Sequence, residues 1–347
     1  MRFSVFKTRL PNRKRRAFTL VEIMTATAIM LILIMFTTRI ASDMLRAYNN
    51  TISSLTANAD SRAVLDPIDN DLSSLYFPND GKYWFEVRYD ENNQGNLDGN
   101  ELPRVYFFSQ ARDRVRRIID GNTKKELPGT VTALAYRIEQ ASPFGDTINS
   151  PENLSYIFYR STLNSQDTQK IAMPYVIGNE TTNSEEKRVP SAFWKSGEQI
   201  TDPTDEQKYA VKTWATDLQN YTCDGVVNMT FFFWYDDLDD GKRKIAMARN
   251  SALEAQLRQA FPDVEIKVFS KSIAISSDKI MFDDRANNKT NATLRAIDVS
   301  ITMLTQSGRD LLLAEQRQRN NGKIDDKKFT QILREHGVTY TRNIKIN

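Results

Sequence analysis

The chain has 347 residues, of which 26% are charged and 40% hydrophobic, close to the average for soluble globular domains. The sequence has only one long apolar segment, near the N-terminus, which excludes a protein with several membrane spans. The formal net charge is +3, but residues 1–17 carry seven basic residues and no acid, so the remainder carries −4. Because no second basic block follows, the charge predicts membrane topology rather than nucleic-acid binding.

The basic residues 1–17 precede an apolar segment, residues 18–36. A helix over this segment is about 28 Å long, close to the hydrocarbon thickness of a bilayer. Since Lys and Arg lie before it, we expect a cytoplasmic N-terminus and a C-terminal domain across the membrane. The apolar core is longer than that of a cleaved secretory signal, and Arg39 follows it. A plain signal anchor is therefore the alternative to a specialised N-terminus.

Glu22 is the single acid within the apolar segment. An ionisable residue at membrane depth is costly and indicates a functional role. A packed helix bundle would give this carboxylate a cationic partner, and removing one member of a buried pair costs roughly 3–5 kcal/mol. The alternative is a tolerated interfacial residue. We favour a role in helix packing.

Residues 13–36 read RKRRAFTLVEIMTATAIMLILIMF. This segment resembles the N-terminus of type IV prepilins, in which a basic leader and a small residue precede Phe-Thr-Leu-Val/Ile-Glu and an apolar helix. The resemblance implies a bacterial inner-membrane protein whose leader is cut by a prepilin peptidase between Ala17 and Phe18. The peptidase then methylates the Phe18 amine. Glu22 becomes the fifth mature residue, and the resemblance implies that it pairs with Phe18 of a neighbouring subunit. Ala17 stands where the family usually has Gly.

An amphipathic pattern with helical periodicity continues through residues 37–75, so we expect one helix over residues 18–75. Its second half should pack onto a globular domain through an apolar stripe. Pro67 is expected to break or restart this helix, with Asp66 as a cap. The stripe consists of Ile40, Met44, Leu45, Tyr48, Ile52 and Leu55.

Residues 76–347 change to short runs of period two, rich in β-branched and aromatic residues and separated by turn signals. This pattern predicts an α+β domain with a mainly antiparallel sheet. Residues 161–204 are polar and indicate an irregular insertion, and helices are expected within 205–219 and 309–335. The candidate strands are residues 83–89, 104–110, 130–140, 154–160, 226–237, 266–276, 294–304 and 339–347.

Four segments of the domain carry a second resemblance. They read DSRAVLDPIDNDLSSL (60–75), GVVNMTFFFWYDD (225–237), LRAIDVSITML (294–304) and TYTRNIKIN (339–347). In this order they resemble the larger minor pseudopilins of the J type in type II secretion. They are also similar to pilin-like proteins encoded in multi-gene cassettes of environmental bacteria. The resemblance implies a subunit of a filament or of its tip complex.

Residues 90–101, DENNQGNLDGNE, fit the spacing of a 12-residue calcium loop, with Gly95 at the turn. Hairpin loops between strands have the same composition, and we prefer a hairpin without metal. Residues 236–241, DDLDDG, have Leu238 where a ligand is required and predict a turn. The candidate calcium ligands are Asp90, Asn92, Gln94, Asn96, Asp98 and Glu101.

No phosphate-binding glycine loop, zinc-spaced Cys/His set or nucleophile elbow occurs in the sequence. Cys223 is the single cysteine, which excludes an intrachain disulfide and predicts a small core residue. His336 is the single histidine and is expected at the surface or as a cap. We therefore predict a non-enzymatic pilin-like subunit without a cofactor. The alternatives are a signal-anchored domain that binds calcium or another ligand without forming filaments, and an anchored hydrolase.

Overall fold

The fold is described from a computed structural model, which confirms the α+β class: a long N-terminal helix is followed by a large, mostly antiparallel sheet. The chain divides into two compact units, residues 1–52 and 53–347. The structure describes residues 19–89, 102–110, 116–120, 123–127, 131–141, 155–163, 165, 168–177, 190, 200–201, 208–209, 220–248, 251–283, 288–318 and 324–346.

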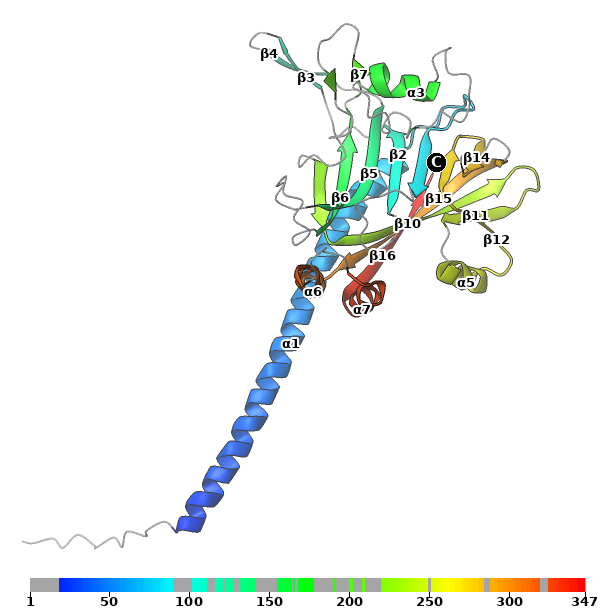
Figure 1. Ribbon diagram of the computed structural model, residues 1–347. Helices are drawn as coiled ribbons and strands as arrows, with labels where there is room; N and C mark the ends of the chain where they lie inside the picture. The colour runs from blue at the N-terminus through cyan, green and yellow to red at the C-terminus, as the bar shows by residue number, and fades with distance from the viewer. Residues whose placement is uncertain are drawn as a thin grey trace, which may run out of the picture. The chain divides into compact units, whose positions relative to one another are not determined.

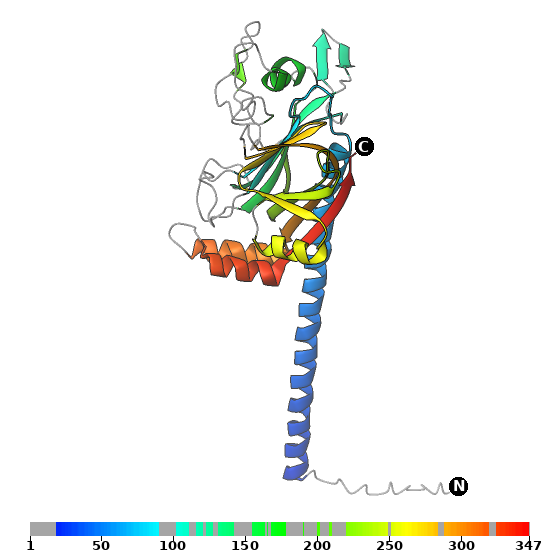
Figure 2. The same ribbon diagram turned by 90° about the vertical axis from the view of Figure 1, so that its right-hand side faces the viewer.

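Helix α1 runs from Leu20 to Ser73 without interruption (Figures 1 and 2). Its apolar part is long enough to cross a membrane, and none of that part is buried by the residues that the structure describes. The predicted break at Pro67 is wrong, because Pro67 lies inside the helix. An interior proline costs about 3 kcal/mol. Burial of the adjacent Val64, Leu65 and Ile68 opposes that cost.

The predicted packing stripe of α1 is also wrong. Its six apolar residues, from Ile40 to Leu55, are 43% to 68% exposed. The buried face begins with small residues four apart, and large apolar residues join it only later. Small side chains let a helix backbone approach its neighbour closely, and a search for large apolar residues overlooks them. The buried face consists of Ser53, Ala57, Ser61, Val64, Leu65, Ile68, Asp71 and Leu72.

One large sheet forms the body of the domain (Figure 1). Each pair of neighbouring strands is antiparallel except β11 and β12. That parallel pair needs a crossover, which α5 (Ser251–Ala260) supplies. In spatial order the strands are β12 (Glu265–Phe269), β11 (Arg243–Ala248), β10 (Val226–Asp237), β15 (Lys289–Leu304), β14 (Lys279–Phe282), β13 (Ser272–Ile275), β1 (Phe85–Tyr89), β2 (Pro103–Ser109), β5 (Thr132–Ala141), β6 (Ser155–Thr162) and β9 (Tyr221–Asp224), with β16 (Gly337–Lys345) on β15.

The smaller elements lie around this sheet. Helices α6 (Gln306–Arg317) and α7 (Asp326–His336) run side by side before β16 (Figure 2). A π-helical turn, η2 (Thr168–Ala172), leads into α3 (Met173–Ile177). Two short hairpins complete the described elements: β3 (Arg116–Asp120) with β4 (Thr123–Leu127), and β7 (Ile200–Thr201) with β8 (Lys208–Tyr209).

All eight candidate strands occur, although residues 266–276 form two strands, β12 and β13. The helices expected within 309–335 are α6 and α7, and residues 238–240 form the predicted turn. The helix expected within 205–219 is wrong at Lys208–Tyr209, which is strand β8, and its remaining residues lie outside the described part. Strands β9, β11 and β14 and helix α5 were not expected, because they are short or uneven in hydrophobic pattern.

The core forms where β10 packs across the sheet onto β2, β5 and β6. Strand β10 follows period two, so Phe231, Phe233 and Tyr235 point inward and are fully buried. Phe233 contacts the rings of Phe85 and Phe269. On the opposite face of β10, a separate apolar cluster packs beneath α5. Both faces of this central strand are therefore covered along part of its length.

Candidate functional site: the start of helix α1 and its docked end

The first turn of α1 is closed by Thr19 and Glu22. The Thr19 backbone N–H and hydroxyl donate to Glu22 Oε2, at 2.9 Å and 3.0 Å, and the Glu22 N–H donates to Thr19 Oγ1 at 3.3 Å. This reciprocal arrangement is a capping box. Its signature, Thr-x-x-Glu, is present in the sequence and could have predicted the role of Thr19 as the helix cap. Ala17 and Phe18 lie outside the described residues, so their predicted processing is not tested by the structure.

The membrane-length part of α1 presents apolar side chains outward along its whole surface. Its threonine hydroxyls donate to carbonyl oxygens of the same helix. Thr25 bonds to Val21 O at 3.0 Å, and Thr27 bonds to Met24 O at 2.9 Å. Polar groups satisfied within the helix are what a hydrocarbon environment requires. This surface is suited to lipid or to neighbouring apolar helices.

Residues 12–38 match the family model of the prokaryotic N-terminal methylation motif. The N-terminus is type IV prepilin-like. This motif contains Ala17, Phe18 and Glu22, and together with the apolar helix it indicates a membrane anchor. Proteins that carry the motif are pilin-like, a structural rather than an enzymatic class. No curated protein and no solved structure matches the chain.

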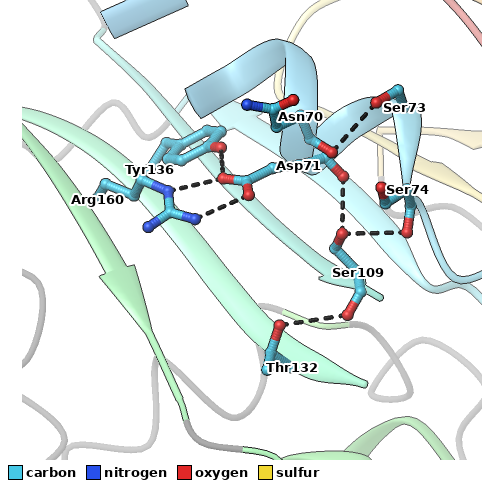
Figure 3. A network of polar contacts seen from close by, with 8 residues as sticks. All are labelled: Asn70, Asp71, Ser73, Ser74, Ser109, Thr132, Tyr136 and Arg160. Atoms are coloured by element: carbon cyan, nitrogen blue, oxygen red, sulfur yellow. Dashed lines mark hydrogen bonds and ion pairs between the residues drawn. The ribbon is translucent and has the colours of Figure 1, made fainter. Parts of the chain in front are cut away.

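Beyond the methylation motif, the far end of α1 is fixed to the sheet through Asp71 (Figure 3). The Asp71 carboxylate accepts two hydrogen bonds from Arg160, Nε to Oδ2 at 2.7 Å and Nη2 to Oδ1 at 2.8 Å, and a third from the Tyr136 hydroxyl. Asp71 is only 1% exposed. Burial, followed by the charge of Asp71, raises the pKa of Tyr136 well above its ordinary value, so this hydroxyl remains a donor.

The backbone at the same helix end is held by β2. The Ser109 hydroxyl donates to the carbonyl oxygens of Asp71, at 2.8 Å, and Ser74, at 3.0 Å. These are among the carbonyls that a helix C-terminus leaves without partners. Thr132 on β5 donates to Ser109 O at 3.2 Å, which ties the group to a further strand (Figure 3). Nothing in the local sequence distinguishes Asp71 from Asp66 or Asp69, because only the fold decides which aspartate meets an arginine in the core.

Two further arginines hold α1 at its acidic residues. Arg309 of α6 binds Asp60 of α1, Nη2 to Oδ2 at 2.8 Å, and also Asp224 at the end of β9. Arg342 of β16 contacts Asp66 and Asp69. The Arg309 side chain is 9% exposed, whereas those of Arg342 and Asp66 are 39% and 59% exposed. Exposed charged groups can be hydrated in place of pairing with each other, so the Arg342 ion pairs contribute least to the attachment of α1.

The acidic side chains at the turn after β10 surround the ammonium group of a lysine, Lys244. Lys244 Nζ lies 2.7 Å from Asp240 Oδ2, 2.9 Å from Asp237 Oδ2 and 3.1 Å from Glu265 Oε2. The hydrogen bond from Lys244 lowers the pKa of Asp240. Asp240, followed by Asp237, raises the pKa of Lys244, so the ammonium stays charged. Lys244 therefore offsets part of the negative charge of Asp237, Asp240 and Glu265.

The predicted calcium loop, residues 90–101, lies outside the described residues. Its flanking strands are described: β1 and β2 form an antiparallel hairpin with Tyr89 opposite Pro103. Calcium binding by residues 90–101 therefore stays a prediction. Among the residues that the structure describes, no group of three or more acids, histidines or cysteines is placed to hold a metal ion.

Cys223 is buried, as its sequence context predicted. Burial, followed by the charges of Asp60 and Asp224, raises the pKa of its thiol to about 12. Because the thiolate is the nucleophilic form of cysteine, this thiol is poorly reactive near neutral pH. The position of Cys223 therefore fits a core residue and not a nucleophile.

Proposed function

We propose that the chain is a minor pilin-like subunit, a pseudopilin, that is processed by a prepilin peptidase and assembled through α1. The peptidase cuts between Ala17 and Phe18 and methylates the Phe18 amine. The assembly is a filament of the type II secretion or type IV pilus kind, or its tip complex. The observation that carries this proposal is the N-terminal methylation motif at residues 12–38, which includes the start of an apolar helix that no described residue covers.

The exposed stripe of α1 supports assembly. Its six apolar residues, Ile40 to Leu55, follow the membrane-length segment and are exposed in the single chain. Large exposed apolar patches on a protein usually mark an interaction surface. Burying one such side chain fully is worth roughly 1.5–3 kcal/mol. Packing against α1 helices of other subunits would bury the stripe.

The geometry of Glu22 fits a pairing role after processing. Both hydrogen bonds that Glu22 accepts from Thr19 go to Oε2. Among the residues that the structure describes, Oε1 accepts no hydrogen bond, and cleavage before Phe18 would create an ammonium group on a neighbouring subunit with which it could pair. In a low-dielectric bundle, an unpaired charge costs several kcal/mol. The pairing would therefore set the axial register between helices.

The proposed location follows from charge and domain size. The basic leader supports a cytoplasmic N-terminus and a domain on the periplasmic face of a bacterial inner membrane. Residues 53–347 form a large unit that is difficult to repeat along a narrow filament. A minor, tip-located role of the J-type kind is therefore proposed. We propose the peptidase, other pilin-like subunits and the membrane as its partners, and no nucleic acid. We propose no enzymatic activity.

The test combines mass spectrometry with an assembly assay in cells that contain the peptidase. We expect a mature N-terminus at methylated Phe18, and we expect Glu22→Gln to abolish incorporation without changing the melting of the domain. Thr19→Val is the matched control, because it removes the helix cap, worth about 1 kcal/mol, but keeps the Glu22 charge. An uncut Met1 in membrane-bound protein would instead support the signal-anchored alternative. Equal loss of assembly in Thr19→Val would show that Glu22 acts only as a cap.

A further inference from the structure

The docked end of α1 combines features that a simple packing contact does not need. Asp71 is held through its carboxylate by Arg160 and Tyr136, and through its carbonyl oxygen by Ser109. The bonds come from three different strands, β6, β5 and β2. Side chain and backbone of one helical residue are therefore fixed at the same point.

The chain directly after the helix is fixed as well. The Gln110 N–H donates to Ser74 O at 2.8 Å, and the Tyr76 N–H donates to Phe108 O at 2.9 Å. Leu75 forms a β-bridge with Ser109. The exit from α1 thus continues as paired backbone on β2, so the helix end cannot shift along its axis without breaking these bonds.

We propose that Asp71 is the clamp through which an axial pull on α1 passes into the sheet, and that release of Asp71 from Arg160 limits detachment of residues 53–73. The physiological source of such a pull rests on the proposed function, since a subunit anchored by α1 in a filament or membrane is loaded along that helix. The clamp itself is a property of residues 53–347.

The burial of its carboxylate separates the clamp from the other ion pairs of the helix, because the side chain of Asp71 is 2% exposed, whereas those of Asp60 and Asp66 are 29% and 59% exposed. A helix is stiff, so an axial pull loads all contacts along residues 53–73 together. Exposed ion pairs such as Asp66–Arg342 exchange their partners with water at little cost. The Asp71 and Arg160 side chains are 2% and 16% exposed. Water has little access to the Asp71 carboxylate until the helix has moved, so its bonds must break before replacements form.

A constant-force measurement on the full chain in detergent tests the clamp. Handles are attached at Ser54→Cys on α1 and Leu238→Cys in the β10–β11 turn, both exposed positions. Native Cys223 is buried and does not compete for the labels. The test variant, Asp71→Asn with Arg160→Gln, removes both charges, keeps the volume of residue 71 and shortens residue 160. Removing both charges spares equilibrium stability better than removing one charge.

We expect the lifetime of the docked helix at fixed force to shorten about tenfold or more in this double variant, since even 1.4 kcal/mol corresponds to tenfold. The urea midpoint of the double variant should stay near that of the parent chain. Asp66→Asn is the control and should keep the parent lifetime. Tyr136→Phe, which removes one bond worth about 1 kcal/mol, should shorten the lifetime about fivefold even if the double variant does not fold.

A parent-like lifetime in the double variant or, if it does not fold, in Tyr136→Phe overturns the clamp. Equal shortening in Asp66→Asn also overturns it, because resistance would then be spread along the helix. The force measurement needs no assembly, whereas the Glu22→Gln test needs it. Failure of the clamp and failure of the proposed function are therefore distinguishable.

Discussion

Gly225, between β9 and β10, lies where a methyl group should be costly. Its φ is +80°, in the left-handed region that L side chains rarely adopt. Its backbone cannot relax freely, because its N–H donates to Tyr156 O at 2.7 Å and its carbonyl accepts from Leu304 N at 2.9 Å. A Cβ at this position would lie 2.9 Å from both Cδ and Nε of Arg309. Gly225→Ala therefore meets backbone strain and a steric contact together.

The two contributions can be estimated separately. The left-handed conformation costs an alanine roughly 1–2 kcal/mol. Displacing Arg309 weakens its contacts with Asp60 and Asp224, and the guanidinium is largely buried, so we assign about 1 kcal/mol to each pair, the upper end for exposed pairs. Gly225→Ala should thus lower the free energy of unfolding by about 3–4 kcal/mol.

Gly241 provides a matched control. It also has a positive φ, +68°, but no atom lies within 4 Å of the added Cβ. Gly241→Ala should cost only the strain, roughly 1–2 kcal/mol. Urea unfolding of the full chain in detergent, followed by tryptophan fluorescence, gives both values. In Gly225→Ala combined with Arg309→Met, the two costs should be less than additive, because the variants share one contact.

Equal destabilisation by Gly225→Ala and Gly241→Ala would refute the contact with Arg309. Strict additivity in the combined variant would do the same. Either result would mean that Arg309 moves away from the new methyl group without losing its carboxylates.

Three further outcomes are expected. The free energy of unfolding should fall as pH rises from about 9 to 12, because the folded thiol of Cys223 has a pKa of about 12 and keeps its proton to a higher pH than the unfolded thiol. Cys223→Ser should make this fall shallower. An unchanged slope in Cys223→Ser would contradict the raised pKa of the thiol. Calcium should raise the melting temperature of the chain only if the predicted loop binds it, and Asp90→Ala and Glu101→Ala should remove that rise; equal rises in all forms would exclude the loop. Phe233→Ala should lower the free energy of unfolding by about 3–5 kcal/mol, since the side chain is fully buried, whereas Leu238→Ala at an exposed turn should stay within about 0.5 kcal/mol.

The strands could be predicted because their pattern is local. A strand with one buried face alternates every second residue, so β10 was found with its observed bounds, residues 226–237. Strand β14 has only four residues, too few for alternation to be recognised. The spatial order of the strands was not predicted, because the sequence pattern does not record which strands pair.

The packing of α1 shows the limit of hydrophobic pattern most clearly. The large apolar residues at 40–55 favoured an intrachain contact, yet they are exposed, and the small residues Ser53, Ala57 and Ser61 are buried instead. Hydrophobicity indicates that a residue is costly to expose, but it does not identify the partner that covers it. An element that packs in an assembly and an element that packs in its own domain have the same pattern.

The sequence by itself determined the prepilin-like N-terminus, because a basic leader, Phe18-Thr-Leu-Val-Glu22 and an apolar helix are contiguous and need no tertiary contact to act. It also determined the α+β class through the change from helical to strand periodicity. Only the tertiary structure decided that Asp71 meets Arg160 and Tyr136, residues 89 and 65 positions away. Such a contact depends on which strands lie beneath the helix, and that is fixed by the packing of the whole core.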